Sequence, residues 1–147
     1  MTTSISRAGP ADLDALAALF DAYRQFYGQP SDIARARQWL RERLRFGESV
    51  VLVARRDGTA VGFVQLYPMF SSVRTAKTWI LNDLYVDAGA RRQGVARQLL
   101  DAAAAFARED GAAGISLETT QDNHAARALY RAAGWQEDVT QWYSLGF

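Results

Sequence analysis

Hydrophobic positions recur every three or four residues in four segments of the chain, and this spacing predicts four amphipathic helices. The segments span residues 9–28, 31–47, 91–110 and 123–135. Residues typical of helix ends flank them, with Pro10, Ser31 and Asn123 at starts and Gly28 and Gly134 at ends. Such residues satisfy the free backbone groups of a helix end or interrupt the helix. They therefore predict the same helix ends as the spacing of the hydrophobic residues.

Shorter apolar runs predict the strands of a sheet. The runs cover residues 4–8, 49–56, 59–67, 78–86, 115–120 and 140–147. Asp57 and Gly58 favour a hairpin between the second and third runs, and residues 68–77 are predicted to form a polar connection. A hairpin followed by a strand–helix–strand crossover, with parallel strands at 78–86 and 115–120, predicts an α/β (α+β) fold. Its mixed, twisted sheet would be flanked by helices in a single domain over residues 1–147.

Composition fits an ordinary globular protein, because 49% of the residues are hydrophobic. The net charge of +1 argues against a general nucleic-acid binder. The arginines of residues 35–45 fit a solvated helix face, with an acidic partner as the alternative. The sequence contains no cysteine, which excludes disulfides, thiolate metal sites and a cysteine nucleophile. His124 is the single histidine, so we expect no metal cofactor.

The sequence also bears on location. No apolar run approaches the roughly 20 residues that a membrane-spanning helix needs. The first ten residues lack the apolar core of a signal peptide. We therefore expect a soluble cytoplasmic protein with no membrane partner and no nucleic-acid partner.

Basic residues crowd the turn that precedes the third predicted helix. Arg91, Arg92 and Arg97 surround Gly94 there. The start of a helix exposes unpaired N–H groups with a partial positive charge, and glycine allows a ligand to approach the backbone closely. The turn therefore indicates an anion site of diphosphate size, and a solvent-exposed basic helix start explains the same residues equally well.

Three segments, in order along nearly the whole chain, resemble the GNAT superfamily of N-acetyltransferases. They are "WILNDLYVD" at residues 79–87, the Arg-x-x-Gly-x-Ala turn at 91–96 and "DNHAARALYRAAGW" at 122–135. The first looks most like the branch of diamine acetyltransferases and of histone- and amine-acetylating enzymes. The resemblance implies the GNAT acyl-CoA N-acyltransferase fold. It also implies transfer of acetyl from acetyl-CoA, the co-substrate, to a primary amine by direct attack in a ternary complex.

The same resemblance assigns residues to acetyl-CoA. The main chain of Leu84, Tyr85 and Val86 would face the acetyl-pantetheine arm, and Arg91, Arg92, Gln93, Gly94, Val95, Ala96 and Arg97 would hold the pyrophosphate. Asn123 and Ala126 would lie along the pantetheine arm, and Tyr130 would protonate the departing thiolate. Asn123 and Tyr130 stand about two helical turns apart and so share a face. Tyr130 also fits a packed aromatic residue beside Trp135.

Asn82 and Asp83 are unusual in the middle of a strand, because burying an unpaired polar group is costly. Strict alternation predicts that they point to opposite faces, with Asp83 on the face of Leu81. Asp83 is a candidate for binding the amine or removing its proton through water, and a structural role is its alternative. Relatives often carry Glu where Asn82 stands, and Asn82 cannot act as a base. Glu118, in the neighbouring predicted strand, is a second candidate.

The acceptor, a small-molecule amine or a protein amine, is not identified by these residues. Tyr23 and Tyr27 close the first predicted helix, where the family places a wall of the acceptor pocket, and they fit the core equally well. The alternative functions are a non-catalytic CoA-binding regulatory module on the same fold and an arginine-rich nucleic-acid-binding domain. Relatives of this branch often form homodimers, so residues 142–147 are a candidate interface.

Overall fold

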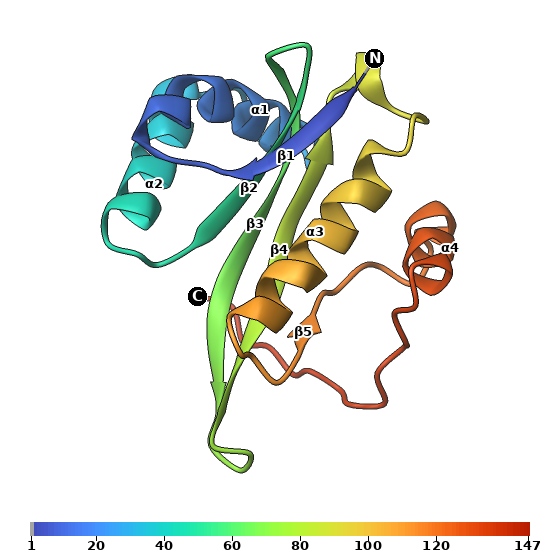
Figure 1. Cartoon of the computed structure of the whole chain (residues 1–147). Helices are drawn as coiled ribbons and strands as arrows, with labels where there is room; N and C mark the ends of the chain where they lie inside the picture. The colour runs from blue at the N-terminus through green and yellow to red at the C-terminus, as the bar shows by residue number, and fades with distance from the viewer. Residues whose placement is uncertain (1) are drawn as a thin grey trace.

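Among residues 2–147, which the computed structural model describes, five strands form one sheet in the order β1-β2-β3-β4-β5 (Figure 1). They are β1 (Thr3–Arg7), β2 (Val50–Arg56), β3 (Thr59–Ser71), β4 (Ala76–Val86) and β5 (Ile115–Ser116). The first four are antiparallel neighbours, and β5 pairs with β4 in parallel. The predicted mixed sheet, the first hairpin and the parallel crossover are confirmed.

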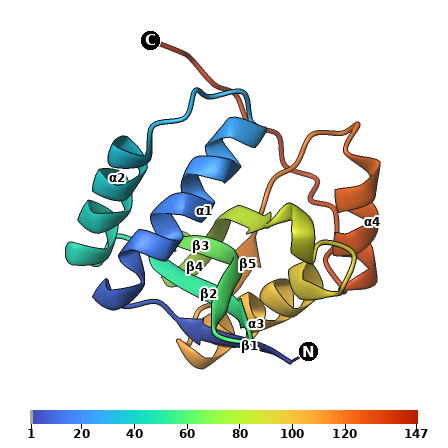
Figure 2. The same ribbon diagram turned by 90° about the horizontal axis from the view of Figure 1, so that it is seen from above.

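Helices cover both faces of this sheet (Figure 2). The α-helices are α1 (Leu13–Phe26), α2 (Ile33–Arg45), α3 (Val95–Glu109) and α4 (His124–Ala132), and the 3₁₀-helices are η1 (Pro10–Asp12) and η2 (Ala88–Ala90). α1 and α2 lie over one face, α3 lies over the other, and α4 stands to the side of α3 (Figures 1 and 2). The helices predicted from the apolar periodicity are confirmed at all four positions.

The periodic apolar residues form one core on each side of the sheet. On the α1/α2 side, Leu16, Phe20 and Leu40 pack on Val51, Val53 and Phe63. On the α3 side, Val95, Leu99 and Ala103 pack on Leu52, Val64 and Leu66. Each fully buried Leu or Phe stabilises the fold by about 1.5–3 kcal/mol. The two cores hold β3 and β4 rigidly between α1 and α3, and these two strands carry the candidate site.

The connection between α1 and α2 is fixed by Asp21, which is buried although it is charged. Its carboxylate accepts hydrogen bonds from Gln25 Nε2 at 3.1 Å, Ser31 Oγ at 2.7 Å and the Asp32 backbone N–H at 2.7 Å. Ser31 was predicted to cap α2. This prediction is wrong, because the Ser31 hydroxyl donates a hydrogen bond to Asp21 and does not cap the helix. Asp32 caps α2 instead and accepts from the Arg35 N–H at 3.0 Å.

Three strand predictions need correction. Residues 68–77 are not a polar connection, because β3 and β4 continue through them and turn only at residues 72–75. β5 ends at Ser116, four residues before the predicted end of its strand. The predicted strand at 140–147 is absent from the described chain, because no neighbouring strand supplies hydrogen bonds there. Trp142 and Tyr143 of this segment are 79% and 90% exposed.

A β-bulge interrupts β4 at the polar pair. Gln65 of β3 pairs with Asp83, and the next residue of β3, Leu66, pairs with Leu81, which leaves Asn82 as the extra residue. The bulge reverses the alternation of side chains, so Leu81 before it and Leu84 after it both pack toward α3. The expectation that Asp83 shares a face with Leu81 is therefore wrong. The side chain of Asp83 points to the α1/α2 side of the sheet, where its hydrogen-bond partner Gln65 lies.

Candidate active site

One edge of β4 is free where the site begins. β4 and β5 pair only through Trp79 and Ile80, and within the described chain no strand pairs with the outer edge of β4 from residue 81 onward (Figure 1). Such an edge presents unpaired N–H and C=O groups that can bind an extended ligand as another strand would. Leu84 and Val86 turn their main-chain groups toward this edge, although the Val86 carbonyl already accepts a hydrogen bond from Arg91 Nε at 2.8 Å. The main chain of Tyr85 was predicted to face the ligand too, and this prediction is wrong because its carbonyl points toward β3.

The free edge leads into a turn with two left-handed residues. Arg92 has φ 60° and Gly94 has φ 81°, and Gly94 forms the N-cap of α3 without a side-chain hydrogen bond. The first N–H groups of α3, from Val95 to Arg97, therefore point out of the helix without a capping partner. A Cβ at Gly94 would meet no heavy atom within 4 Å, so the backbone is open to an approaching anion.

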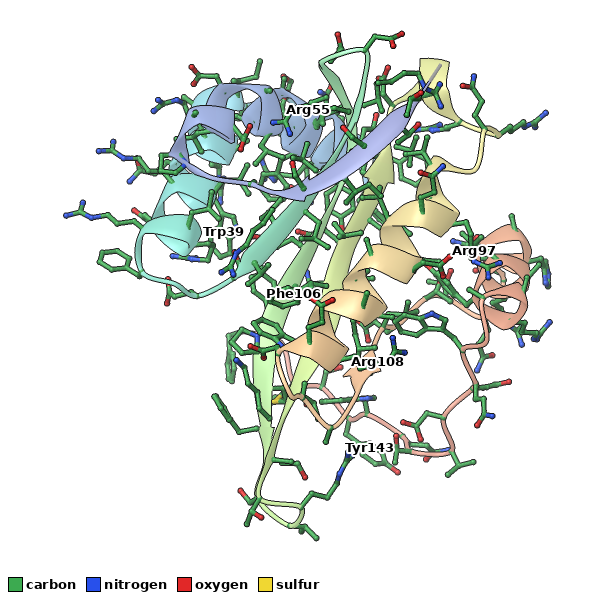
Figure 3. The ribbon with its side chains drawn as sticks, in the orientation of Figure 1. Trp39, Arg55, Arg97, Phe106, Arg108 and Tyr143 are labelled. Carbon is green, nitrogen blue, oxygen red and sulfur yellow. The ribbon has the colours of Figure 1, made fainter. Side chains whose placement is uncertain are left out.

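The side chains of this turn have mostly structural partners. Arg91 lies over the Tyr85 ring, 5.5 Å from its centroid, and Gln93 accepts a hydrogen bond from Arg56. Arg97 Nε lies 3.1 Å from Asp101, and its side chain projects from α3 in Figure 3. Arg92 is exposed and forms no ion pair with any residue from 2 to 147. The turn therefore offers mainly backbone N–H groups to an anion, together with one unpaired guanidinium.

α4 carries the second group of predicted residues. The Asn123 side chain caps the helix by accepting from the Ala126 N–H at 3.3 Å, which confirms its predicted capping role. Tyr130 is half-buried, and its ring centroid lies 6.4 Å from that of Trp135. Burial, and then the nearby Tyr27, raise the pKa of Tyr130 above its ordinary value of 10.0. Tyr130 is therefore protonated at neutral pH and able to donate a proton.

Asp83 lies in a buried network of hydrogen bonds. Gln65 Nε2 donates to Asp83 Oδ2 at 2.5 Å, and Asn82 Nδ2 donates to Asp83 Oδ1 at 2.9 Å. Ser49 extends the network by donating to Gln65 Oε1 at 2.9 Å. Asn82 and Asp83 were predicted to point to opposite faces, and the bulge instead brings their side chains into contact. Asn82 cannot act as a base itself, but its side-chain amide orients the carboxylate of Asp83.

The environment of Asp83 shifts its pKa. Burial raises the pKa of Asp83 above its ordinary value of 3.8, and the hydrogen bonds from Gln65 and Asn82, with the nearby Tyr23 hydroxyl, oppose that rise. Burial, and then the Asp83 charge, raise the pKa of Tyr23, so its hydroxyl remains a donor. A carboxylate whose pKa is raised toward neutrality is better matched to taking a proton from an amine. Because Asp83 is only 3% exposed, such a proton must reach it through a relay.

Tyr23 and Tyr27 join the two ends of the site. Their rings touch edge to face with centroids 5.1 Å apart, and Tyr23 also contacts Tyr85 of β4 at 6.3 Å. The Tyr23 hydroxyl donates to the Asn82 carbonyl at 3.4 Å. Tyr27 also contributes to the raised pKa of Tyr130 on α4. Tyr23 therefore lies beside the Asp83 network with Tyr27 next to it, and Tyr23 also packs on the core.

One predicted residue lies outside the site, and two residues of the Asp83 network were not predicted. Glu118 lies beyond the end of β5, is exposed and has no hydrogen-bond partner between residues 2 and 147. It is not in a strand and not in the Asp83 network. Sequence reasoning missed Gln65 and Ser49, which complete that network. Gln65 interrupts the apolar run "GFVQLY", the same signal that drew attention to Asn82 and Asp83.

Residues 2–147 contain no group of three or more His, Asp or Glu residues arranged to hold a metal ion. None of their helices has the length and apolar character that crossing a membrane requires.

Comparisons with known proteins agree with this geometry. A model of the Acetyltransferase (GNAT) family matches residues 15–135. YhfO of Bacillus subtilis, an uncharacterized N-acetyltransferase, is 44% identical over 136 residues, or 92% of this chain and 91% of that protein. A probable acetyltransferase of Haemophilus influenzae is 35% identical over 96 residues, or 65% of this chain and 66% of that one.

A solved structure extends the match to three dimensions. The crystal structure of a probable acetyltransferase superposes with a TM-score of 0.94 at 43% sequence identity, covering 98% of this chain and 97% of that one. The chain therefore belongs to the GNAT family of acetyltransferases. It is an enzyme, and the family to which it belongs uses acetyl-CoA as the acetyl donor.

Proposed function

We propose that this acetyltransferase moves the acetyl group of acetyl-CoA to a primary amine by direct attack in a ternary complex. The observation that carries the proposal is the free edge of β4, which leads into the open turn at the start of α3. The edge suits the extended pantetheine arm, and the turn suits the pyrophosphate. The residues of this chain therefore fit acetyl-CoA at the positions that the sequence assigned.

The binding residues divide by the part of acetyl-CoA that they would hold. The outward-facing main chain of Leu84 and the N–H of Val86 pair with pantetheine, and one N–H of this edge polarises the thioester carbonyl. The N–H groups from Gly94 to Arg97 bind the pyrophosphate, with Arg92 as an additional charge. The Asn123 amide uses its oxygen to cap α4, so its N–H₂ group is the part that donates to the pantetheine arm.

Acid–base roles follow from the two ends of the site. Acetyl-CoA supplies an activated thioester, whose C–S bond breaks as the amine nitrogen forms a bond to the acetyl carbon. Asp83 accepts the proton that the amine loses, relayed through water beside Tyr23, since its carboxylate is buried. Tyr130 donates its hydroxyl proton to the CoA sulfur. The retention of both groups supports catalysis over a non-catalytic CoA-binding module.

The exposed C-terminal segment supports a homodimer as a second proposal about this chain. Trp142, Tyr143 and Leu145 are at least 79% exposed, which is unusual for three large apolar side chains so close together. The segment has no strand partner within the described chain. A second copy would supply one, and size-exclusion chromatography with light scattering tests whether the protein elutes at twice 16.3 kDa.

The experiment that tests the enzymatic proposal follows release of free CoA thiol. The protein is incubated with acetyl-CoA and a panel of amino acids, diamines, aminoglycosides and lysine-containing peptides. We expect thiol release that depends on one class of amine, with the N-acetylated product identified by mass spectrometry. Thiol release that no amine stimulates, in a preparation that binds acetyl-CoA, would contradict the proposal and favour the non-catalytic module.

A further inference from the structure

A pocket of about 330 Å³ lies between α1 and α2, on the side of the sheet that carries Asp83. Phe20 and Arg24 line it from α1, and Arg35, Trp39 and Glu42 line it from α2. Figure 3 labels Trp39 on α2. The volume is at the lower end of the range for small-molecule sites, so the pocket suits a ligand of amino-acid size.

Arg24 is the unusual residue of this pocket. Its Nη1 atom is buried and has no hydrogen-bond partner, and no carboxylate between residues 2 and 147 forms an ion pair with it. Arg56 provides a contrast, because its Nε is also unpaired while its other nitrogens contact Gln93 and Thr3. A buried guanidinium nitrogen without an acceptor is costly, so Arg24 is a group that a ligand oxygen would satisfy.

The acidic residues near Arg24 already have other partners. Asp21 accepts three hydrogen bonds from Gln25, Ser31 and the Asp32 N–H. Glu42 accepts from Gln38 Nε2 at 2.6 Å and pairs with Arg43 at 3.4 Å. Arg24 acts on Asp21 through its charge, which helps to lower the pKa of Asp21, but no ion pair joins the two within residues 2–147. Arg35, also without an ion pair in the described chain, adds a second cation to the lining of the pocket.

The pocket adjoins the Asp83 network through two contacts. Tyr23 directly precedes Arg24, and its ring stacks on the pocket residue Phe20 with centroids 6.0 Å apart. The Tyr23 hydroxyl reaches the Asn82 carbonyl beside Asp83. The side chain of Tyr23 therefore connects the pocket to the backbone beside the proposed base.

We propose that the acceptor carries a carboxylate as well as its amine, and that Arg24 binds the carboxylate. The acceptor class is an amino acid or a short peptide with a free carboxylate, and this inference rests on the proposed function. The guanidinium of Arg24 forms charge-assisted hydrogen bonds to the carboxylate oxygens. The same positive charge favours the neutral form of the amine and repels polycationic acceptors such as diamines and aminoglycosides.

Matched pairs of amines test this inference. Phenylalanine is compared with phenethylamine, and lysine with 1,5-diaminopentane, because each pair differs only by the carboxylate. We expect kcat/KM to be about 10- to 100-fold higher for the carboxylate-bearing member of at least one pair, as charge-assisted hydrogen bonds predict. Equal or better transfer to the decarboxylated members of both pairs would overturn the inference and leave the proposed function intact.

Substitution of Arg24 assigns the preference to this residue. Arg24→Gln should raise KM for the preferred carboxylated amine about 10-fold or more and leave kcat/KM for its decarboxylated partner unchanged. Arg24→Lys should retain part of the preference, because it keeps the charge and loses the fork of donors. The matched control is Arg37→Gln, an exposed arginine of α2 that pairs with Asp14 outside the pocket and should leave both values unchanged. A preference that survives Arg24→Gln contradicts the assignment.

Binding measurements keep the test independent of turnover. Titration of phenylalanine and lysine into the protein with CoA present should show binding that weakens about 10-fold or more in Arg24→Gln. Absence of binding by both carboxylated amines would overturn this inference. If they bind but no amine is acetylated, Arg24 binds carboxylates and the proposed function fails, so the ligand is not an acceptor. Circular dichroism and melting temperatures establish that each variant is folded.

Discussion

Gln65 Nε2 donates a hydrogen bond to the carboxylate of Asp83 at 2.5 Å, across the ladder between β3 and β4. Gln65 is fully buried, and its own amide oxygen is held by Ser49. The amide therefore points its N–H₂ group at Asp83 and favours the ionised carboxylate, while burial favours the protonated one. The basicity of Asp83 depends on the balance of these two effects.

Replacing Gln65 with Leu tests that balance. The loss of this donor should raise the pKa of Asp83 further, because the Gln65 hydrogen bond lowers it. The proposed base acts only when ionised, so the fall of kcat/KM on the acid side should begin at a higher pH in Gln65→Leu than in the unmodified enzyme. A pH–rate profile for a fixed amine gives the measurement, and an unchanged acid limb would contradict the coupling of Gln65 to Asp83.

Replacing Asp83 with Asn tests the base itself. We expect kcat/KM to fall about 10²- to 10⁴-fold, the range for loss of a positioned general base, and the acid limb assigned to Asp83 to disappear. Asp14→Asn, an exposed carboxylate of α1, is the control and should keep the profile of the unmodified enzyme. If Asp83→Asn retains full activity, Asp83 has only a structural role.

Tyr130→Phe separates proton donation from packing. The ring that contacts Trp135 is kept and the hydroxyl is lost, so acetyl-CoA should still bind while kcat falls about 10- to 1,000-fold. The control is Tyr143→Phe, in the exposed C-terminal segment, which should leave kcat unchanged. Single-turnover rates and the Kd for acetyl-CoA are measured together, and an undiminished rate in Tyr130→Phe would refute the general-acid role.

Two glycines with nearly the same backbone angle test the anion turn. Gly94 and Gly111 stand just before and just after α3 with φ 81° and 80°, and a Cβ at either meets nothing within 4 Å. Substitution by Ala should therefore impose similar backbone strain, about 1 kcal/mol, at both positions. Only Gly94→Ala should also weaken acetyl-CoA binding, measured by titration calorimetry. Equal affinity of both variants for acetyl-CoA would argue against this turn as the pyrophosphate site.

Asp21 gives a prediction about stability and pH. Hydrogen bonds from the Asp32 backbone and Ser31 lower its pKa below the ordinary value of 3.8. A lowered pKa stabilises the folded state above the unfolded pKa, and this contribution is lost as the pH falls through the folded value. Asp21→Asn should therefore lower Tm at pH 7 by about 2–8 °C, with a smaller difference near pH 3. Thermal melts across pH provide the data, and a difference that is constant with pH would contradict this role.

Much of the fold follows from local sequence signals. The four helices, the hairpin at Asp57–Gly58 and the parallel crossover have periodicity or turn residues that specify them. The predicted C-terminal strand did not form, because apolar alternation indicates that a strand can form but not whether a neighbour exists to pair with it. β5 is short for a similar reason, since it leaves β4 after Ser116.

The site was predicted less completely than the fold. The glycine turn and the cap at Asn123 depend on short local patterns and could be identified along the chain. The bulge at Asn82 could not, because it depends on the register between β3 and β4. The pairing of Gln65 with Asp83 joins residues far apart in sequence, and only the folded sheet brings them together. Arg24 gave no sequence signal, since its environment arises from the packing of α1 on α2.

The crystal structure of the protein with CoA bound tests the account most directly. We expect the pantetheine arm to lie along the free edge of β4, from Leu81 to Val86, with the pyrophosphate at the N–H groups that follow Gly94. We also expect the CoA sulfur to lie within about 3.5 Å of the Tyr130 hydroxyl, which is hydrogen-bonding distance. CoA bound elsewhere, or a sulfur beyond hydrogen-bonding reach of Tyr130, would contradict it.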